Sequence, residues 1–236
     1  MAKLVRLDKF LCDMELGTRS EVKIFLKKGF VMVDGVIQKS PDFKIDPDRQ
    51  GIAFQGKRLS YQEFYYYMLH KPAGVITATE DKVQETVMSL LGTDARKDLF
   101  PVGRLDKDTE GLLLITNDGV LSHALLSPRK HVPKTYFVEI PKKLDLGQIE
   151  ALEHGVDIGD DKATLPAKVE VLDDTHIHLT ICEGRYHQIK RMLYAVGSEV
   201  LYLKRVSFGA LTLDSDLPKG SYRALTKEEI TALKDR

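Results

Sequence analysis

A short run of apolar residues between a charged loop and a tight turn constrains the fold of this chain more than any other feature. Residues 103–119 read GRLDKDTEGLLLITNDG. The apolar run 112–115 predicts a buried strand, and Asn117-Asp118-Gly119 predicts the turn that closes it. The loop before the strand carries Arg104 and Asp106. A carboxylate fixed by a buried strand beside a cation suits chemistry on a polyanion, because the cation can meet the phosphates.

The other predicted elements are short and lie close together along the chain. Their spacing favours hairpins, and no repeating strand–helix–strand period is present. We therefore expect an α+β fold with a mixed, largely antiparallel sheet. The predicted strands are 64–69, 112–116, 135–140, 166–172, 176–182 and 200–206, and the predicted helices are 119–126, 145–154, 185–196 and 227–235.

The first sixty residues predict a small module of their own. Apolar residues at positions 7, 10, 11 and 14 form one helix face, and a capping box from Thr18 to Glu21 opens a second helix. Asp34-Gly35 suits the tight turn of a hairpin over residues 30–37.

The polar stretch 55–60 is the predicted linker, so we expect one domain over residues 1–60 and another over 61–236. The net charge is zero, but residues 1–60 carry 12 Lys and Arg against 8 Asp and Glu, an excess of four positive charges. The segment 121–138 contains no acidic residue. Local basic patches of this kind are sufficient to neutralise the phosphates of one RNA site.

Composition excludes several other classes of protein. Two cysteines are too few for a disulfide framework, and no Cys/His spacing predicts a metal site. No apolar run approaches the roughly 20 residues of a membrane span, and the first ten residues lack the apolar core of a signal peptide. We expect a cytoplasmic monomer without cofactor, metal or membrane contact.

Four motifs, in this order, resemble those of pseudouridine synthases. They are KPAG at 71–74, the stretch 103–119, KTY at 134–136 and EGRYHQIKR at 183–191. His70 departs from the asparagine usual before the first motif. Residues 5–60, with two helices feeding a hairpin, resemble the alpha-L RNA-binding module named after ribosomal small-subunit protein 4. The resemblance implies isomerisation of a uridine in RNA, without net redox change.

The resemblance also implies roles for individual residues. Asp106 matches the essential aspartate, as nucleophile or proton acceptor, and Lys190 matches the cation beside it, where many synthases have arginine. Tyr136 matches the tyrosine placed against the target uracil, and Arg104 a wedge or phosphate anchor. Asp108 matches a variable position and is assigned no role. The further expected RNA contacts are Lys71, Arg129, Lys130, Lys134, Arg185 and His187, together with Arg19, Lys23, Lys27 and Lys28 of the first module.

The branch that modifies small-subunit ribosomal RNA is the most similar, through residues 127–136, 183–188 and 211–214. Sister enzymes acting on large-subunit RNA, an RNA N-glycosylase and a non-catalytic ribosome-assembly factor are the alternatives. The expected partner is ribosomal RNA or an assembling subunit. Attack at C1′, attack at C6 and a glycal route all remain open for Asp106.

Overall fold

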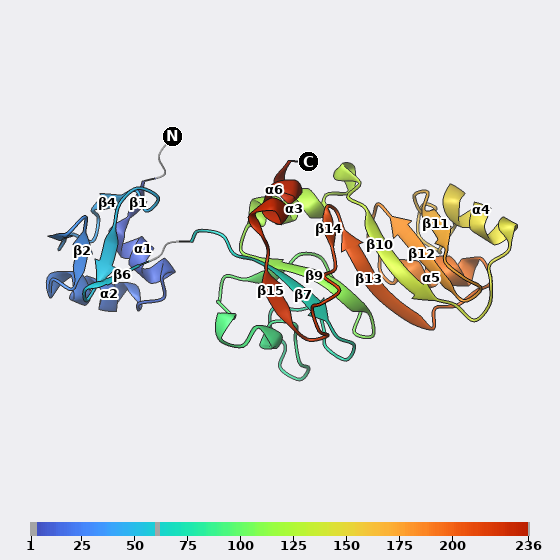
Figure 1. Cartoon of the computed structure of the whole chain (residues 1–236), viewed down its shortest axis with the longest axis horizontal. Coiled ribbons are helices and arrows are strands. Elements are labelled where there is room, and N and C mark those ends of the chain that lie inside the picture. Colours follow the sequence, from blue (N-terminus) through green and yellow to red (C-terminus); the bar gives the residue numbers. More distant parts are fainter. Residues whose placement is uncertain (1–3, 60–61, 236) are drawn as a thin grey trace. The chain divides into compact units, whose positions relative to one another are not determined.

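The computed structural model describes residues 4–59 and 62–235, which divide into two compact units (Figure 1). The units meet in the sequence between residues 63 and 64. The predicted boundary between residues 60 and 61 lies outside the described residues. Each unit has its own hydrophobic core, because the buried cluster of the N-terminal unit contains no residue beyond Leu59.

The N-terminal unit packs two helices against small sheets. Helix α1 (Leu7–Asp13) is followed by α2 (Arg19–Lys27), which begins with the predicted capping box between Thr18 and Glu21. A four-stranded sheet has the order β3-β2-β5-β6, and β1 pairs with β4. The strands are β1 (Val5–Arg6), β2 (Val31–Val33), β3 (Val36–Ile37), β4 (Lys44–Ile45), β5 (Ile52–Phe54) and β6 (Lys57–Arg58).

The predicted linker over residues 55–60 is wrong for its described part. Gln55 and Gly56 have φ of 49° and 79° and form the turn between β5 and β6. The backbone N–H of Leu59 then donates to the carbonyl of Ile52. Residues 55–59 therefore belong to the sheet, and their polarity reflects a hairpin at the surface.

The C-terminal unit is built on a nine-stranded sheet with the main order β11-β12-β10-β13-β9-β7-β15. Every pairing is antiparallel except that of β13 with β9, which confirms the predicted α+β class with a mixed, largely antiparallel sheet. The strands are β7 (Tyr66–Lys71), β8 (Phe100–Pro101), β9 (Glu110–Thr116), β10 (Lys134–Glu139), β11 (Lys168–Val171), β12 (His176–Ile181), β13 (Tyr202–Phe208), β14 (Leu211–Thr212) and β15 (Tyr222–Ala224).

Strand β9 explains the apolar run of the sequence. Leu112 and Leu114 pack into one core, whereas Leu113 and Ile115 pack into the core on the other side of the sheet. A strand covered on both faces is apolar throughout instead of alternating. The charged loop that precedes it is thereby attached to the most deeply buried element of the unit.

A glycine permits the parallel pairing that joins the two halves of the sheet. Gly111 lies opposite Arg205 at φ +107°, and a Cβ there would come within 2.2 Å of the Arg205 carbonyl oxygen. No other residue fits that approach, so Gly111→Ala would push β9 away from β13.

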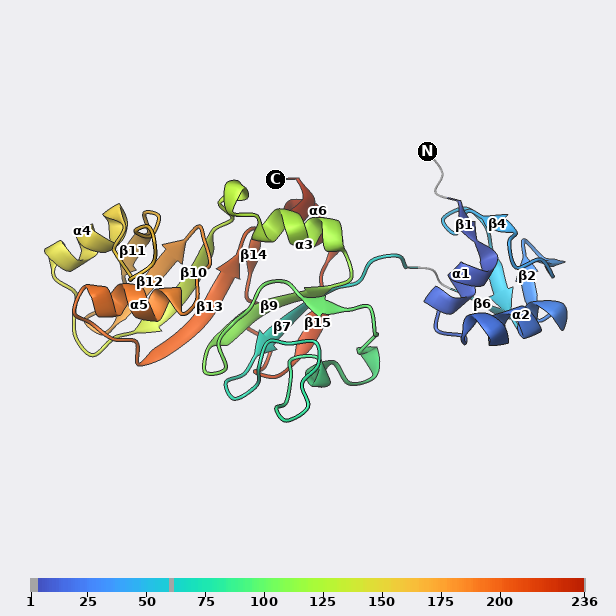
Figure 2. The same cartoon turned by 180° about the vertical axis from the view of Figure 1, so that it is seen from behind.

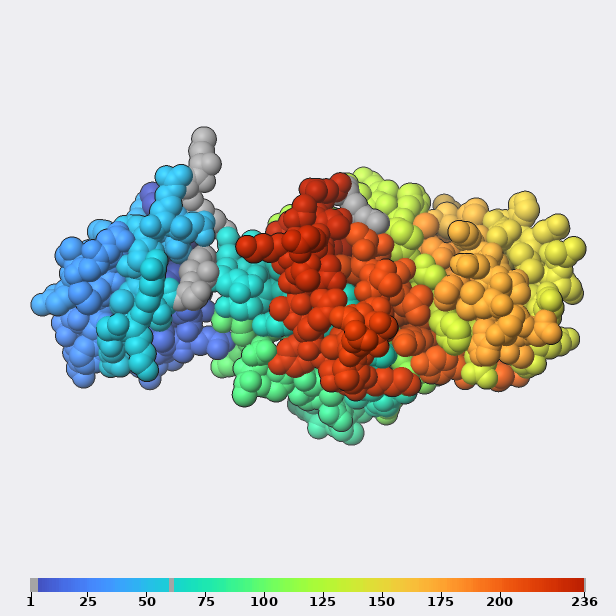
Figure 3. Space-filling view, viewed as in Figure 1, coloured from blue at the N-terminus to red at the C-terminus, as the bar shows by residue number. Residues whose placement is uncertain are grey.

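Helices cover both faces of the sheet. They are α3 (Gly119–Leu126), α4 (Leu146–His154), α5 (Gln188–Ala195) and α6 (Lys227–Lys234), with 3₁₀ turns η1 (Ser89–Asp94) and η2 (Pro128–Lys130). Helix α5 packs on the face of β10 and β12, and Figure 2 shows it in front of these strands. Helices α3 and α6 cover the opposite face, where the C-terminal residues form much of the surface in Figure 3.

Several predicted boundaries are displaced, including two beside the motifs at 71–74 and 183–191. Helix α5 begins at Gln188 instead of residue 185, because His187 has a left-handed φ of 48° and ends the preceding loop. Strand β7 extends to Lys71 instead of ending at residue 69. His70 and Lys71 therefore lie on the strand, and both are buried.

Candidate active site

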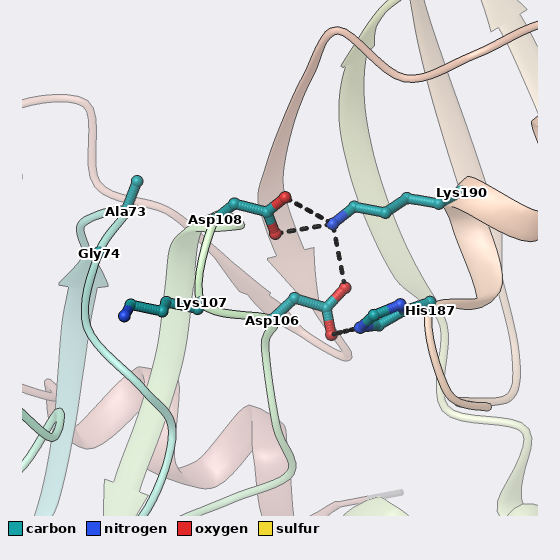
Figure 4. Close-up of a pocket in the computed structure, with 7 residues that line it drawn as sticks. All are labelled: Ala73, Gly74, Asp106, Lys107, Asp108, His187 and Lys190. Carbon is teal, nitrogen blue, oxygen red and sulfur yellow. Dashed lines mark hydrogen bonds and ion pairs between the residues drawn. The ribbon is translucent and has the colours of Figure 1, made fainter. Parts of the chain in front are cut away.

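A pocket in the C-terminal unit brings three of the sequence motifs together. Its lining residues are Ala73, Gly74, Asp106, Lys107, Asp108, His187 and Lys190. They come from the loop after β7, the loop before β9 and the start of α5 (Figure 4). The pocket thus lies where β7 ends and β9 begins, at adjacent ends of two paired strands.

Asp106 lies between two nitrogen-bearing side chains in this pocket. Its Oδ2 is 3.5 Å from the Lys190 Nζ, and its Oδ1 is 3.6 Å from the His187 Nε2. The Asp106 side chain is 29% exposed, so a ligand can reach it from solvent. Lys190 was predicted to lie beside Asp106, and the geometry places it there.

Asp108 forms a shorter contact with Lys190 than Asp106 does. The Lys190 Nζ donates to both carboxylate oxygens of Asp108 at 2.7 Å, as Figure 4 shows. These hydrogen bonds lower the pKa of Asp108 below its ordinary value. Asp108 was assigned no role from the sequence, because it matches a variable position of the family, and the lysine that it contacts lies 82 residues away. One cation is therefore shared by two carboxylates.

Lys71 holds the loop of Asp106 through hydrogen bonds to its backbone carbonyls. Its Nζ donates to the carbonyls of Asp106 and Thr109 at 3.0 and 2.9 Å, and to that of Pro72 at 3.0 Å. The side chain is fully buried, which lowers its pKa to about 8. The prediction that Lys71 contacts RNA is therefore wrong for this structure, because protein carbonyls enclose its ammonium group.

Two further groups fix the same loops. The Thr77 hydroxyl donates to the Leu105 carbonyl at 2.8 Å. The Glu110 carboxylate accepts from the Tyr202 hydroxyl at 2.5 Å and pairs with the Lys219 Nζ at 2.7 Å. These three interactions could not be predicted from the sequence, because they join segments distant in sequence. Asp106 is consequently held through its backbone on both sides, independently of its carboxylate.

Two other predicted RNA contacts are engaged within the protein. Lys134 is 9% exposed and its Nζ donates to the Val132 carbonyl, so it is not a surface cation as predicted. Arg185 donates to the carbonyls of Lys162 and Ala163 and pairs with Glu183. These bonds brace the loop before α5. Arg185 keeps part of its side chain exposed, so its RNA contact stays a prediction beside this bracing role.

Tyr136 lies in the middle of β10 and belongs to the hydrophobic core. It is 8% exposed and is not among the residues that line the pocket. Its predicted contact with the target base therefore stays a prediction.

Seven predicted cationic RNA contacts are exposed: Arg104, Arg129 and Lys130 in the C-terminal unit, and Arg19, Lys23, Lys27 and Lys28 on or beside α2.

Among residues 4–59 and 62–235, no group of three or more His, Cys, Asp and Glu side chains is arranged to hold a metal ion. Within the same described residues, no helix has the length and apolar character needed to cross a membrane.

Comparison with known proteins agrees with this architecture. Residues 65–195 match the RNA pseudouridylate synthase family, and residues 5–50 match the S4 domain. The chain belongs to the RNA pseudouridylate synthase family. It is thus an isomerase, a pseudouridine synthase with an N-terminal S4 domain, as the motifs predicted.

Three relatives extend over almost the whole chain. An uncharacterized RNA pseudouridine synthase, YtzG of Bacillus subtilis, is 50% identical, covering 98% of this chain and 99% of its own. The ribosomal small subunit pseudouridine synthase A of Vibrio cholerae is 43% identical, with coverages of 97% and 99%. A crystal structure of a pseudouridylate synthase is 38% identical, with a TM-score of 0.69 and coverages of 97% and 99%.

Proposed function

We propose that this enzyme converts one uridine of small-subunit ribosomal RNA to pseudouridine, acting as a cytoplasmic monomer on the RNA or on an assembling subunit. The observation that carries the proposal is Asp106, reachable from solvent between Lys190 and His187 on a braced loop. Full-length similarity to enzymes named for the small subunit supports this choice of RNA.

The reaction breaks the bond between uracil N1 and ribose C1′, turns the base and joins C5 to C1′. The uridine must first leave its stack, which costs a few kcal/mol. Arg104, exposed two residues before Asp106, would hold the opened RNA by its phosphate or fill the gap left by the base. Asp106 then acts as nucleophile or as proton acceptor on the sugar, and Lys190 balances its charge.

Tritium release from RNA labelled at uridine C5 tests the reaction, because only bond formation at C5 expels that atom. We expect release from small-subunit ribosomal RNA and none from large-subunit RNA. Release from the large-subunit RNA alone would assign the enzyme to the sister branch. An abasic product would indicate a glycosylase, and binding without release from either RNA would indicate an assembly factor.

The S4 unit should add RNA affinity more than chemistry. A fragment of residues 62–236 should fold, because its core clusters draw on no residue of the N-terminal unit. Loss of the exposed cations Arg19, Lys23, Lys27 and Lys28 should weaken RNA binding and reduce the salt slope by roughly 0.9 for each phosphate that is no longer neutralised. Filter binding over a range of salt concentrations measures both. Equal salt slopes for the fragment and the full chain would show that the S4 unit does not contribute to RNA binding.

Substitution of Tyr136 separates a base contact from a core role. Tyr136→Phe keeps the ring, whereas Tyr136→Leu removes it. If the ring stacks on the uracil, the leucine variant should lose roughly ten- to hundred-fold more activity, because such stacking is worth about 1–3 kcal/mol. Activity is compared with the melting temperature of each variant. Small, equal activity losses accompanied by lower melting temperatures would show that Tyr136 packs in the core and does not contact the base.

A further inference from the structure

An exposed aromatic ring adjoins His187, which lines the pocket. Tyr186 is 74% exposed, although tyrosine buries a large apolar ring when it packs in a core. Its ring stacks on the neighbouring His187 imidazole, with centroids 3.8 Å apart and planes inclined by 18°. His187 in turn lies 3.6 Å from Asp106. Two stacked rings therefore lead outward from the carboxylate, and the outer ring has one face covered.

The backbone that carries Tyr186 is fixed in position. The Arg191 Nη1 donates to the Tyr186 carbonyl at 3.1 Å, and the same side chain also donates to the Ile158 carbonyl. On the other side, the Arg185 N–H donates to the Oε1 of buried Gln188 at 2.9 Å. His187 itself adopts the left-handed region, with φ of 48°. That conformation is costly for a residue other than glycine, so it persists only where the surroundings enforce it.

A rigid, exposed ring beside a reaction pocket has the properties of a stacking platform. Every nucleobase has a flat π face, and stacking on an aromatic side chain needs no particular base edge. Little conformational entropy is lost on binding, because the backbone is already held and the ring already rests on His187.

We propose that the open face of Tyr186 binds the base of a nucleotide that flanks the target uridine. This inference rests on the proposed function, since Asp106 must hold the target uridine for Tyr186 to meet its neighbour. The flanking segment is single-stranded where it binds, because a base within a duplex has no free face. The platform adds affinity without selecting the identity of the base.

The first test measures binding alone and does not depend on catalysis. In an Asp106→Asn background, Tyr186→Ala should weaken binding to transcribed small-subunit ribosomal RNA by roughly five- to hundred-fold. Tyr186→Phe should bind as the parent does. Tyr194→Ala is the matched control, because Tyr194 is 82% exposed on α5, whereas Tyr186 precedes that helix and stacks on His187 of the pocket. Unchanged affinity of the alanine variant would overturn the proposal.

The second test locates the base. Oligonucleotides that span the modified uridine are made with an abasic nucleotide at the 5′ or the 3′ neighbour. One of the two abasic oligonucleotides should bind the parent protein as weakly as the intact oligonucleotide binds Tyr186→Ala. That abasic oligonucleotide should bind Tyr186→Ala no more weakly still. Additive losses at both positions would overturn the base contact. If wild-type protein released no tritium from any RNA, the proposed function would fail, while the first test would still show whether Tyr186 binds RNA.

A structural role for Tyr186 predicts a different result. If the ring only supported His187, Tyr186→Ala should lower kcat and leave RNA affinity unchanged. The stacking platform predicts a raised KM, a nearly unchanged kcat and full activity at saturating RNA. A loss confined to kcat would therefore contradict the proposal.

Discussion

Asp106→Asn should abolish pseudouridine formation while the protein stays folded and still binds RNA. The amide is nearly isosteric with the carboxylate, but it can neither attack the sugar nor accept a proton from it. We expect a loss of tritium release on the order of 10³-fold or more. RNA affinity should stay the same or rise, because one negative charge leaves a site that faces phosphates.

The fold of this variant should be unaffected for a specific reason. The loop of Asp106 is held by hydrogen bonds to its backbone, from Lys71 to the Asp106 carbonyl and from Thr77 to the Leu105 carbonyl. The carboxylate takes part in neither bond. Circular dichroism and thermal melting should therefore match the wild type, and filter binding should show intact RNA affinity. Substantial tritium release by the folded variant would show that the active site lies elsewhere.

The elements that could be predicted from the sequence are those specified by neighbouring residues. The capping boxes at Thr18 and Thr226 both form as the local pattern indicates, and α3 spans the predicted residues 119–126. The unbroken apolar run 112–115 identified the central strand, because burial on both faces leaves no polar alternation. The long motif around Asp106 likewise indicated the pocket, since its residues are consecutive.

The environments of the lysines could not be predicted in this way. Lys71 and Lys134 resemble surface cations in the sequence, yet both are buried, and their ammonium groups donate to backbone carbonyls. For Lys71, the carbonyls of Asp106 and Thr109 belong to a loop 35 to 38 residues away. A lysine is rarely buried unless several acceptors converge on it, and such convergence depends on the tertiary fold. The ion pair between Asp108 and Lys190 was missed for the same reason.

Lys190→Met should reduce activity by about 30- to 100-fold. The substitution keeps an unbranched side chain, one atom shorter, but leaves Asp106 and Asp108 without the ammonium that both contact. Two neighbouring carboxylates without a cation are costly to keep ionised. The expected loss is moderate, because the Lys190 and Asp106 side chains are 28% and 29% exposed and water screens part of the repulsion. Lys190→Arg retains the charge and should stay within about ten-fold of the wild type.

Asp108 allows the origin of this loss to be tested in a double-variant cycle. Asp108→Asn alone should remain active within about ten-fold, because Lys190 then still lies beside Asp106. In the Lys190→Met background the same change removes the second negative charge, so it should recover part of the activity. Tritium release by the four proteins measures the coupling. If Asp108→Asn lowered activity equally in both backgrounds, Lys190 would serve Asp106 by orienting it or by contacting RNA, and charge sharing between the two carboxylates would have no part in catalysis.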